Sequence, residues 1–326
     1  MPGRGAAPDT VLAGIGLMTV AMVVVPLMDA IAKYLGQSLP SLEVAVGRFV
    51  FQAVAAVLAA LVLRQRLTLL PRPFLRHALR GAALAGATLC WFTAVQRMPL
   101  ADGLAIFFIE PMVLTGMSAL VLGEKVGPRR WIAVAVGFLG ALVIIRPGWS
   151  LFGIHALLPA VSAIFFAIYL ILTRSLAGTT STLSMMASAG LTGAAVTSLA
   201  LLVTTAAGIP GWTASAPTLL QWPLLASVGI ISFFSHVLVV MAFARAPAAV
   251  LAPLNYIEIV SATALGFLMF GDFPAPLTWI GIALIVGSGL YIAHRERRVR
   301  AHEVRQTAAV PGENPAGPAG IGHAES

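Results

Sequence analysis

The chain has 326 residues, of which 59% are hydrophobic and only 10% are charged, and its mean hydropathy is +0.94. Because a soluble chain carries about a quarter charged residues, this composition excludes an ordinary soluble domain and indicates a membrane protein. The net charge of +8 does not require a nucleic-acid partner, because membrane proteins concentrate Lys and Arg on their cytoplasmic side.

Apolar runs long enough to cross a bilayer follow one another along the chain. At 1.5 Å per residue, about 20 helical residues span a hydrocarbon core about 30 Å thick. The first run is too long for a removable signal and is expected to remain as a helix. Because the runs are continuous, without alternation of period two, the sequence predicts an all-α integral membrane protein rather than a β-barrel. The ten predicted transmembrane helices cover residues 11–32, 43–63, 80–96, 103–122, 131–146, 152–172, 183–206, 221–243, 248–269 and 277–294.

The distribution of basic residues predicts the orientation in the membrane. With the amino terminus in the cytoplasm, sixteen of the twenty Lys and Arg, including Arg80, fall in cytoplasmic segments. This positive-inside pattern predicts that both termini are cytoplasmic. We expect a cytoplasmic amino terminus over residues 1–10 and a cytoplasmic tail over residues 295–326 that is basic at first and then disordered. Cys90 is the only cysteine, so an intrachain disulfide is excluded.

One stretch of sequence recurs 148 residues later. Residues 109–124 read IEPMVLTGMSALVLGE and residues 257–272 read IEIVSATALGFLMFGD. The two copies predict a first repeat of five helices over residues 11–147 and a second over residues 150–294. Because five is odd, the second repeat enters the membrane upside down, an arrangement typical of alternating-access transporters. Several other residues also have an identical residue 148 positions later in the chain: Ala94, Arg97, Pro99, Ala101, Gly123, Pro128, Trp131 and Ile132.

The matched positions resemble the EamA branch of the drug/metabolite transporter superfamily. The resemblance covers about residues 12–294 and implies a ten-helix carrier for small organic metabolites, with a central cavity lined mainly by helices 1, 3, 4, 6, 8 and 9. In the second copy Ile259 stands where the family pattern has a proline, so the sequence gives no reason to expect the same kink in both copies. The residues that carry the resemblance are Glu110, Pro111, Gly123, Glu124, Glu258, Gly271 and Asp272.

Residues 26–49, PLMDAIAKYLGQSLPSLEVAVGRF, resemble more weakly the branch of these carriers that takes up vitamins such as riboflavin. This likeness implies a riboflavin importer. The alternative is an exporter of amino acids or other metabolites.

Glu110 and Glu258 fall near the middle of their predicted spans, where an ionised side chain costs about 2.5 to 3.5 kcal/mol. Low-polarity surroundings favour the neutral form of a carboxyl group, so both glutamates are candidates for proton coupling. The alternative is that they are neutral and hydrogen-bond to each other between helices 4 and 9. The sequence leaves both interpretations open.

Two further charged pairs are predicted from spacing along single helices. Asp29 and Lys33 lie four residues apart, one turn after Pro26, so they share a helix face and can neutralise each other. They are candidates for substrate selectivity, with a plain salt bridge as the alternative. Arg48 lies within reach of Glu43, and we expect that pair to be structural.

Other candidate residues are polar or aromatic side chains at helical spacing. Phe165 and Tyr169 belong to an aromatic stripe on helix 6, and Asn255, Glu258 and Ser261 form a polar stripe on helix 9. Trp91 on helix 3 and His236 on helix 8 complete the candidate ring around the site, which would suit a planar, partly polar molecule. Aromatic residues at this spacing also occur as plain packing or lipid-facing residues. The glycines of helices 5 and 10, at Gly137, Gly140, Gly281, Gly287 and Gly289, predict close packing between helices or between the copies of a homodimer.

The sequence does not favour an enzyme. It contains no zinc-protease motif, no nucleophile elbow, no phosphate-binding loop and no Cys/His cluster with metal spacing, so we expect neither a metal nor an organic cofactor. A channel and a membrane scaffold without transport are the other classes considered. An internal inverted pair of repeats favours a carrier over a channel, with a small-molecule substrate and the lipid bilayer as its partners. We expect the membrane to be the bacterial inner membrane, as for a secondary transporter.

Overall fold

The computed structural model describes residues 8–121, 127–176 and 178–309, and these residues form helices and connecting segments without a strand. Predicted motif residues Gly123 and Glu124 lie outside the described residues. The first half of the chain contains α1 (Pro8–Leu35), α2 (Ser41–Val62), α3 (Phe74–Val95), α4 (Leu100–Phe107), α5 (Glu110–Val121) and α6 (Pro128–Phe152). The second half contains η1 (Gly153–Leu157), α7 (Leu158–Ser175), α8 (Thr182–Ala206), α9 (Gln221–Phe243), α10 (Ala248–Leu251), η2 (Ala252–Tyr256), α11 (Ile257–Phe270) and α12 (Pro276–Ala309).

Eight helical segments are long and apolar enough to cross a bilayer within the described part of the chain. Two more apolar stretches, Trp131–Ile145 and Pro276–Ile292, are shorter and belong to α6 and α12. The all-helical membrane fold predicted from composition is therefore confirmed. The full number of ten crossings stays a prediction, because these two stretches fall short of the length that spans a bilayer without tilting or thinning it.

The predicted helices 4 and 9 are both interrupted, and at equivalent positions. The first breaks between Phe107 and Glu110, where the N–H of Ile109 donates to the carbonyl oxygen of Ile106, three residues earlier rather than four. The second begins as α10, tightens into the 3₁₀ helix η2 and continues as α11 from Ile257. Pro111 falls in the first turn of α5, where its missing amide hydrogen is not needed. The second copy thus has an interruption although Ile259 replaces the family proline, since Pro253 lies at the start of η2.

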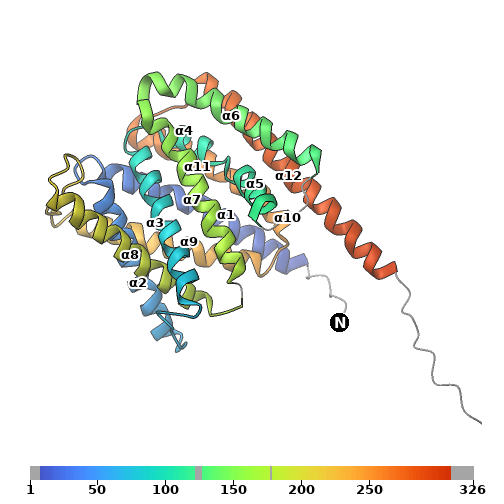
Figure 1. The fold of residues 1–326 in the computed structure, drawn as a ribbon, viewed down its shortest axis with the longest axis horizontal. Helices are drawn as coiled ribbons and strands as arrows, with labels where there is room; N and C mark the ends of the chain where they lie inside the picture. Colours follow the sequence, from blue (N-terminus) through green and yellow to red (C-terminus); the bar gives the residue numbers. More distant parts are fainter. Residues whose placement is uncertain (1–7, 122–126, 177, 310–326) are drawn as a thin grey trace, which may run out of the picture.

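Helices of the first half pack mainly on helices of the second half. Contacts join α1 to α9 and α11, α2 to α8 and α9, α3 to α7 and α8, and α4 to α11. In Figure 1, α6 and α12 run side by side along one edge of the bundle. The interior is therefore shared between the two halves, and a site there would receive residues from both.

Glycines allow the close approach of α6 and α12, as predicted. A Cβ atom on Gly140 would lie 3.0 Å from the carbonyl oxygen of Gly281, and a Cβ atom on Gly281 would lie 2.8 Å from that of Gly140. Gly137 and Gly289 are also close to side chains, whereas nothing lies within 4 Å of the Cβ position of Gly287. The packing role is confirmed for four of the five glycines, and a contact with a second protomer stays a prediction.

Arg80 is a buried residue of the bundle. It was counted among cytoplasmic residues, but it lies inside α3 and is only 3% exposed. Its guanidinium group contacts α7 and α8 rather than solvent. The hydrogen bonds of Arg80 within the bundle account for its burial, and the orientation in the membrane stays a prediction.

Candidate functional site

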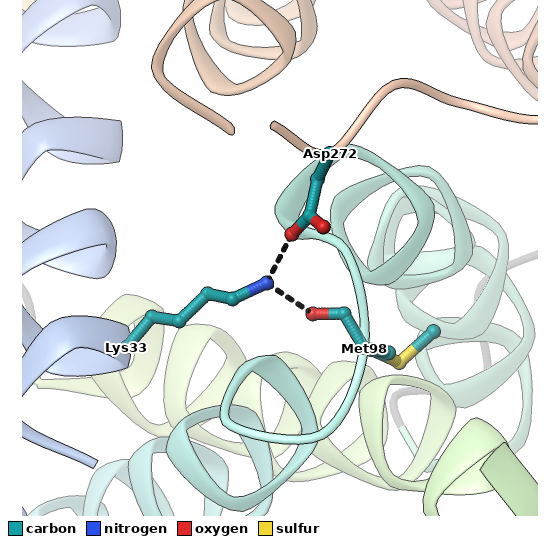
Figure 2. Close-up of polar contacts among 3 residues, drawn as sticks. All are labelled: Lys33, Met98 and Asp272. Carbon is teal, nitrogen blue, oxygen red and sulfur yellow. Dashed lines mark hydrogen bonds and ion pairs between the residues drawn. The ribbon is translucent and has the colours of Figure 1, made fainter. Parts of the chain in front are cut away.

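Lys33, near the end of α1, bridges to the second half of the chain. Figure 2 shows its amino group between the carboxylate of Asp272 and the main-chain carbonyl of Met98. The Nζ–Oδ2 distance is 2.5 Å, and the two side chains are 13% and 28% exposed. The ring of Phe270 lies 4.9 Å from the same amino group. Lys33 thus ties α1 to the segment between α11 and α12, and the predicted local pair with Asp29 is wrong.

Asp102 lies near this ion pair, at the start of α4. It is 8% exposed, and its charge interacts with those of Asp272 and Lys33. The end of the bundle where α1 finishes and α12 begins therefore holds a small group of charges from both halves, which we call the Lys33 cluster: Lys33, Asp102 and Asp272.

Asp29 lies one turn before Lys33 and points to a different partner. Its Oδ1 atom accepts a hydrogen bond of 2.8 Å from the indole nitrogen of Trp91 on α3. Only 4% of Asp29 is exposed. The candidate residues Asp29 and Trp91 are therefore brought together, and the indole fixes the orientation of the carboxylate because its N–H can only donate.

Arg48 is buried in α2 and has no contact with Glu43. Its Nε atom donates a hydrogen bond of 3.3 Å to the hydroxyl of Ser232 on α9, and that hydroxyl donates to Gln52. Glu43 instead accepts hydrogen bonds from the main chain and side chain of Ser215, at 3.0 and 2.8 Å. The predicted Glu43–Arg48 pair is wrong, because each residue faces a different segment of the second half.

Arg80 of α3 is anchored in the second half by three hydrogen bonds. Its donors reach Thr173 Oγ1 at 2.8 Å, the carbonyl oxygen of Met185 at 2.9 Å and the hydroxyl of Tyr169 at 3.1 Å. The guanidinium carbon also lies 4.8 Å from the centroid of the Tyr169 ring. Tyr169 is thus buried in the interior, with its hydroxyl accepting a hydrogen bond from a buried base.

Four aromatic rings form a continuous chain between Trp91 and Tyr169. The ring centroids of Trp91 and Phe107 are 5.6 Å apart, those of Phe107 and Phe166 are 5.5 Å apart, and those of Phe166 and Tyr169 are 5.4 Å apart. Such distances are typical of favourable aromatic pairs. The candidate residue Phe165 is not part of this chain, and its ring instead lies against Gly86 of α3.

Glu110 and Glu258 begin the half-helices that follow the two interruptions. Glu110 is the first residue of α5 and Glu258 the second residue of α11, where the positive end of a helix dipole favours an acid. No hydrogen bond joins them in the part of the chain that the structure describes, which does not support the bridging alternative. Glu110 Oε1 is buried without a hydrogen-bond partner among the described residues, and its charge interacts with Tyr256. The charge of Glu258 interacts with Asp29.

The remaining candidate residues differ in their hydrogen bonding. His236 Nδ1 lies 2.7 Å from the carbonyl oxygen of Ser232 in its own helix. The imidazole also interacts electrostatically with Arg48 and Arg80. Ser261 donates to the carbonyl of Ile257, also in its own helix. The Oδ1 atom of Asn255 is buried and has no partner among the described residues. Within those residues, no group of three or more His, Cys, Asp or Glu side chains is arranged to hold a metal ion.

Comparison with protein families decides the assignment of the chain. The model of the EamA-like transporter family matches residues 12–146 and again residues 153–293. The chain belongs to the EamA-like transporter family. The resemblance noted in the sequence is confirmed, and the two matches agree with the two-repeat layout.

Relatives of this EamA-like chain carry names of several transporters. It is 27% identical to an S-adenosylmethionine uptake transporter of Rickettsia bellii, over 89% of this chain and 97% of the relative. It is 28% identical to a riboflavin transporter of Rhizobium johnstonii, over 89% and 94% of the two chains. It is 30% identical to a pseudopaline exporter of Pseudomonas aeruginosa, over 85% and 95%. A crystal structure with a TM-score of 0.60 and 21% identity, covering 87% of this chain and 98% of that one, shares the fold. The chain is thus a multi-pass membrane protein of a transporter family.

The contacts of Arg48, Arg80, Phe107 and Phe166 were not predicted. Arg80 was counted among the cytoplasmic residues at the start of the predicted helix 80–96, and Arg48 was assigned to a pair along its own helix, because sequence spacing reveals only neighbours on one helix. An arginine inside an apolar segment is costly unless it is paired. That cost is the one sequence signal that could have identified Arg48 as an interior residue.

Proposed function

We propose that the chain is a secondary transporter that moves a small organic metabolite across the bacterial inner membrane by alternating access. It belongs to a family of transporters, and the relatives named above move metabolites in both directions. In this proposal the two halves are inverted repeats, both termini are cytoplasmic, and the substrate lies between the halves. Import of a vitamin such as riboflavin is the specific form, and export of an amino acid or another metabolite is the alternative.

The observation that carries the proposal is the ion pair between Lys33 and Asp272. It joins α1 of the first half to the α11–α12 segment of the second half, and it lies at one end of the bundle rather than at its centre. A carrier must close one end while the other is open. A partly exposed pair between the halves is suited to this purpose, because its net contribution is small enough to be broken in each cycle.

The equivalent interruptions before Glu110 and Glu258 support the same function. Discontinuous helices near the bilayer midplane are typical of substrate and coupling sites in carriers built from inverted repeats. Glu110 has a buried oxygen without a hydrogen-bond partner among the described residues. Such an acid could take up a proton when the neighbouring residues move, so we propose Glu110 and Glu258 as the coupling residues.

Counterflow into proteoliposomes tests the function. Vesicles loaded with unlabelled riboflavin, S-adenosylmethionine or a mixture of amino acids should accumulate the matching labelled compound, and Asp272→Asn should slow that exchange. A channel would instead give single-channel currents without counterflow, and a scaffold would give neither. Export is distinguished from import in cells, where an exporter lowers the internal level of its substrate when the protein is produced.

A further inference from the structure

A groove lies on the outside of the bundle between α6 and α12, which run side by side along one edge (Figure 1). It encloses about 300 Å³, with walls formed by Arg129, Ile132 and Val136 of α6 and by Gly287 and Tyr291 of α12. Ile132 and Tyr291 are exposed, so the groove opens to the surroundings of the bundle and is separate from its interior. In a multi-pass membrane protein, those surroundings are lipid along most of the helix length.

Gly287 gives the groove its open floor. Nothing lies within 4 Å of the position that a Cβ atom would take on this residue, whereas the same position on Gly281 and Gly289 meets side chains of other helices. The neighbouring hydroxyl of Ser288 donates to the carbonyl oxygen of Ile285 in its own helix, so the groove offers an apolar surface. A slender apolar chain fits such a floor, whereas a larger side chain at position 287 would fill the space.

The apolar stretches of α6 and α12 are shorter than a bilayer is thick. Trp131–Ile145 and Pro276–Ile292 extend over about 22 and about 25 Å at 1.5 Å per residue, against a hydrocarbon core about 30 Å thick. Short stretches thin the bilayer around them, which brings lipid headgroups closer to their ends. Trp131 and Tyr291 are exposed at the end of the pair where α6 begins, and such side chains are enriched at the level of the headgroups.

Arg129 supplies a positive charge at this end of the groove. It is the second residue of α6 and is exposed, and the ion pair found among the described residues joins Lys33 to Asp272 instead. The first turn of a helix also favours an anion, because its amide groups are not used within the helix. No Asp or Glu occurs in α6 or in residues 276–295 of α12, so neither stretch supplies an acid that would neutralise Arg129.

We propose that this groove binds a phospholipid with an anionic headgroup, whose phosphate pairs with Arg129 and one of whose acyl chains lies over Gly287. The planar fork of an arginine side chain matches a phosphate with two parallel hydrogen bonds. The sequence beyond Tyr291 is basic, and a basic segment directly after a membrane helix attracts anionic lipids. A zwitterionic phospholipid brings its own amine to this positive region, which makes it the weaker ligand. The basic residues that follow are Arg295, Arg297, Arg298 and Arg300.

A second copy of the chain is the other occupant that an apolar face of this kind could take. A twofold contact pairs such a face with itself, so Arg129 would meet the same two helices of the second copy. Those helices offer it no acid within residues 128–152 or 276–295, and two arginines brought together repel each other. A lipid phosphate supplies the opposite charge that the groove lacks. The charges therefore favour a lipid over a second copy.

Lipids that share their acyl chains and differ in headgroup test this inference. Purified full-length protein, freed of lipid in detergent, is heated with dioleoyl phosphatidylglycerol, with dioleoyl phosphatidylcholine or with glycerol 3-phosphate, which has no acyl chain. A ligand that binds the folded state raises the melting temperature. Phosphatidylglycerol should raise it more than phosphatidylcholine, and glycerol 3-phosphate should leave it unchanged. Equal shifts with the two lipids, or a shift with glycerol 3-phosphate as large as that with phosphatidylglycerol, overturn the proposal.

Two variants assign the parts of this lipid site. Arg129→Gln should weaken binding of phosphatidylglycerol about fivefold, the effect of one basic residue near a charged membrane surface, and should weaken binding of phosphatidylcholine less. Gly287→Leu fills the floor of the groove and should weaken binding of both lipids. Arg76→Gln is the matched control, since Arg76 is also exposed in the first turn of its helix, α3, but lies outside the groove. Equal losses in Arg129→Gln and the control contradict the proposal.

The mass of the protein in detergent, measured by light scattering, tests for a second copy. A monomer that prefers phosphatidylglycerol supports the proposal. A dimer that Gly287→Leu dissociates, without a preference between the lipids, assigns the groove to a second copy and overturns the proposal. The proposed transport is tested separately by counterflow, and failure of either result leaves the other standing, because the groove lies outside the interior of the bundle.

Discussion

Removing the ion pair between Lys33 and Asp272 tests how the two halves of the chain are joined. The perturbation is a double-mutant cycle of Lys33→Met, Asp272→Asn and the combined variant. The pair has an Nζ–Oδ2 distance of 2.5 Å, and its side chains are 13% and 28% exposed. Lys33 also contacts the carbonyl of Met98 and the ring of Phe270. The cycle isolates the interaction with Asp272 from those other contacts.

The exposure of the pair sets the expected magnitude. An exposed salt bridge contributes about 0 to 1 kcal/mol, whereas breaking a buried one by removing one partner costs about 3 to 5 kcal/mol. The Lys33–Asp272 pair lies between these limits, so we expect a coupling energy of about 1 to 3 kcal/mol. If the pair forms only when this end is closed, the same energy shifts the balance between closed and open states by about 5- to 150-fold.

Thermal unfolding of the purified variants measures the coupling, and counterflow measures its effect on transport. The charge-reversed variant, Lys33→Asp with Asp272→Lys, should recover part of the stability and part of the transport lost by each single change. Asp272→Asn combined with Arg245→Met is the control, because Arg245 lies at the far end of α9. Additive effects for Lys33 and Asp272, within about 0.3 to 0.5 kcal/mol, would refute the argument that this contact joins the halves.

Three further changes follow from the structure. Arg80→Gln should lower the unfolding free energy by about 1 to 3 kcal/mol, because it leaves the three oxygen atoms that accept from the guanidinium group without their donor; an unchanged unfolding free energy in thermal unfolding would contradict this. Gly281→Ala should destabilise the contact of α6 and α12 by about 1 to 3 kcal/mol, since its Cβ would lie 2.3 Å from Ile144 Cγ1, whereas Gly287→Ala, in open space, should have little effect. Glu110→Gln keeps the shape of the side chain and should abolish the pH dependence of counterflow; an unchanged pH profile would remove the coupling role.

The sequence alone was sufficient for the membrane class, the helical fold, the repeat and the family. These properties depend on composition, on the length of apolar runs and on matches at a fixed offset, all of which are local or periodic features. Glu110 and Glu258 could be recognised as equivalent for the same reason. Whether the predicted helix 9 is kinked was left open because Ile259 replaces the family proline; in the structure Pro253 lies instead at the start of the 3₁₀ helix that interrupts it.

The tertiary structure decided which charged groups meet. Spacing along one helix predicted Asp29 beside Lys33 and Glu43 beside Arg48, but Lys33 binds Asp272, which lies 239 residues away in the sequence. Arg48 likewise binds Ser232, 184 residues away. Packing of one half on the other removes these side chains from water, so contacts across helices outweigh the weak pairs available on a single helix surface. Such packing depends on the whole fold, and no pattern within one helix specifies it.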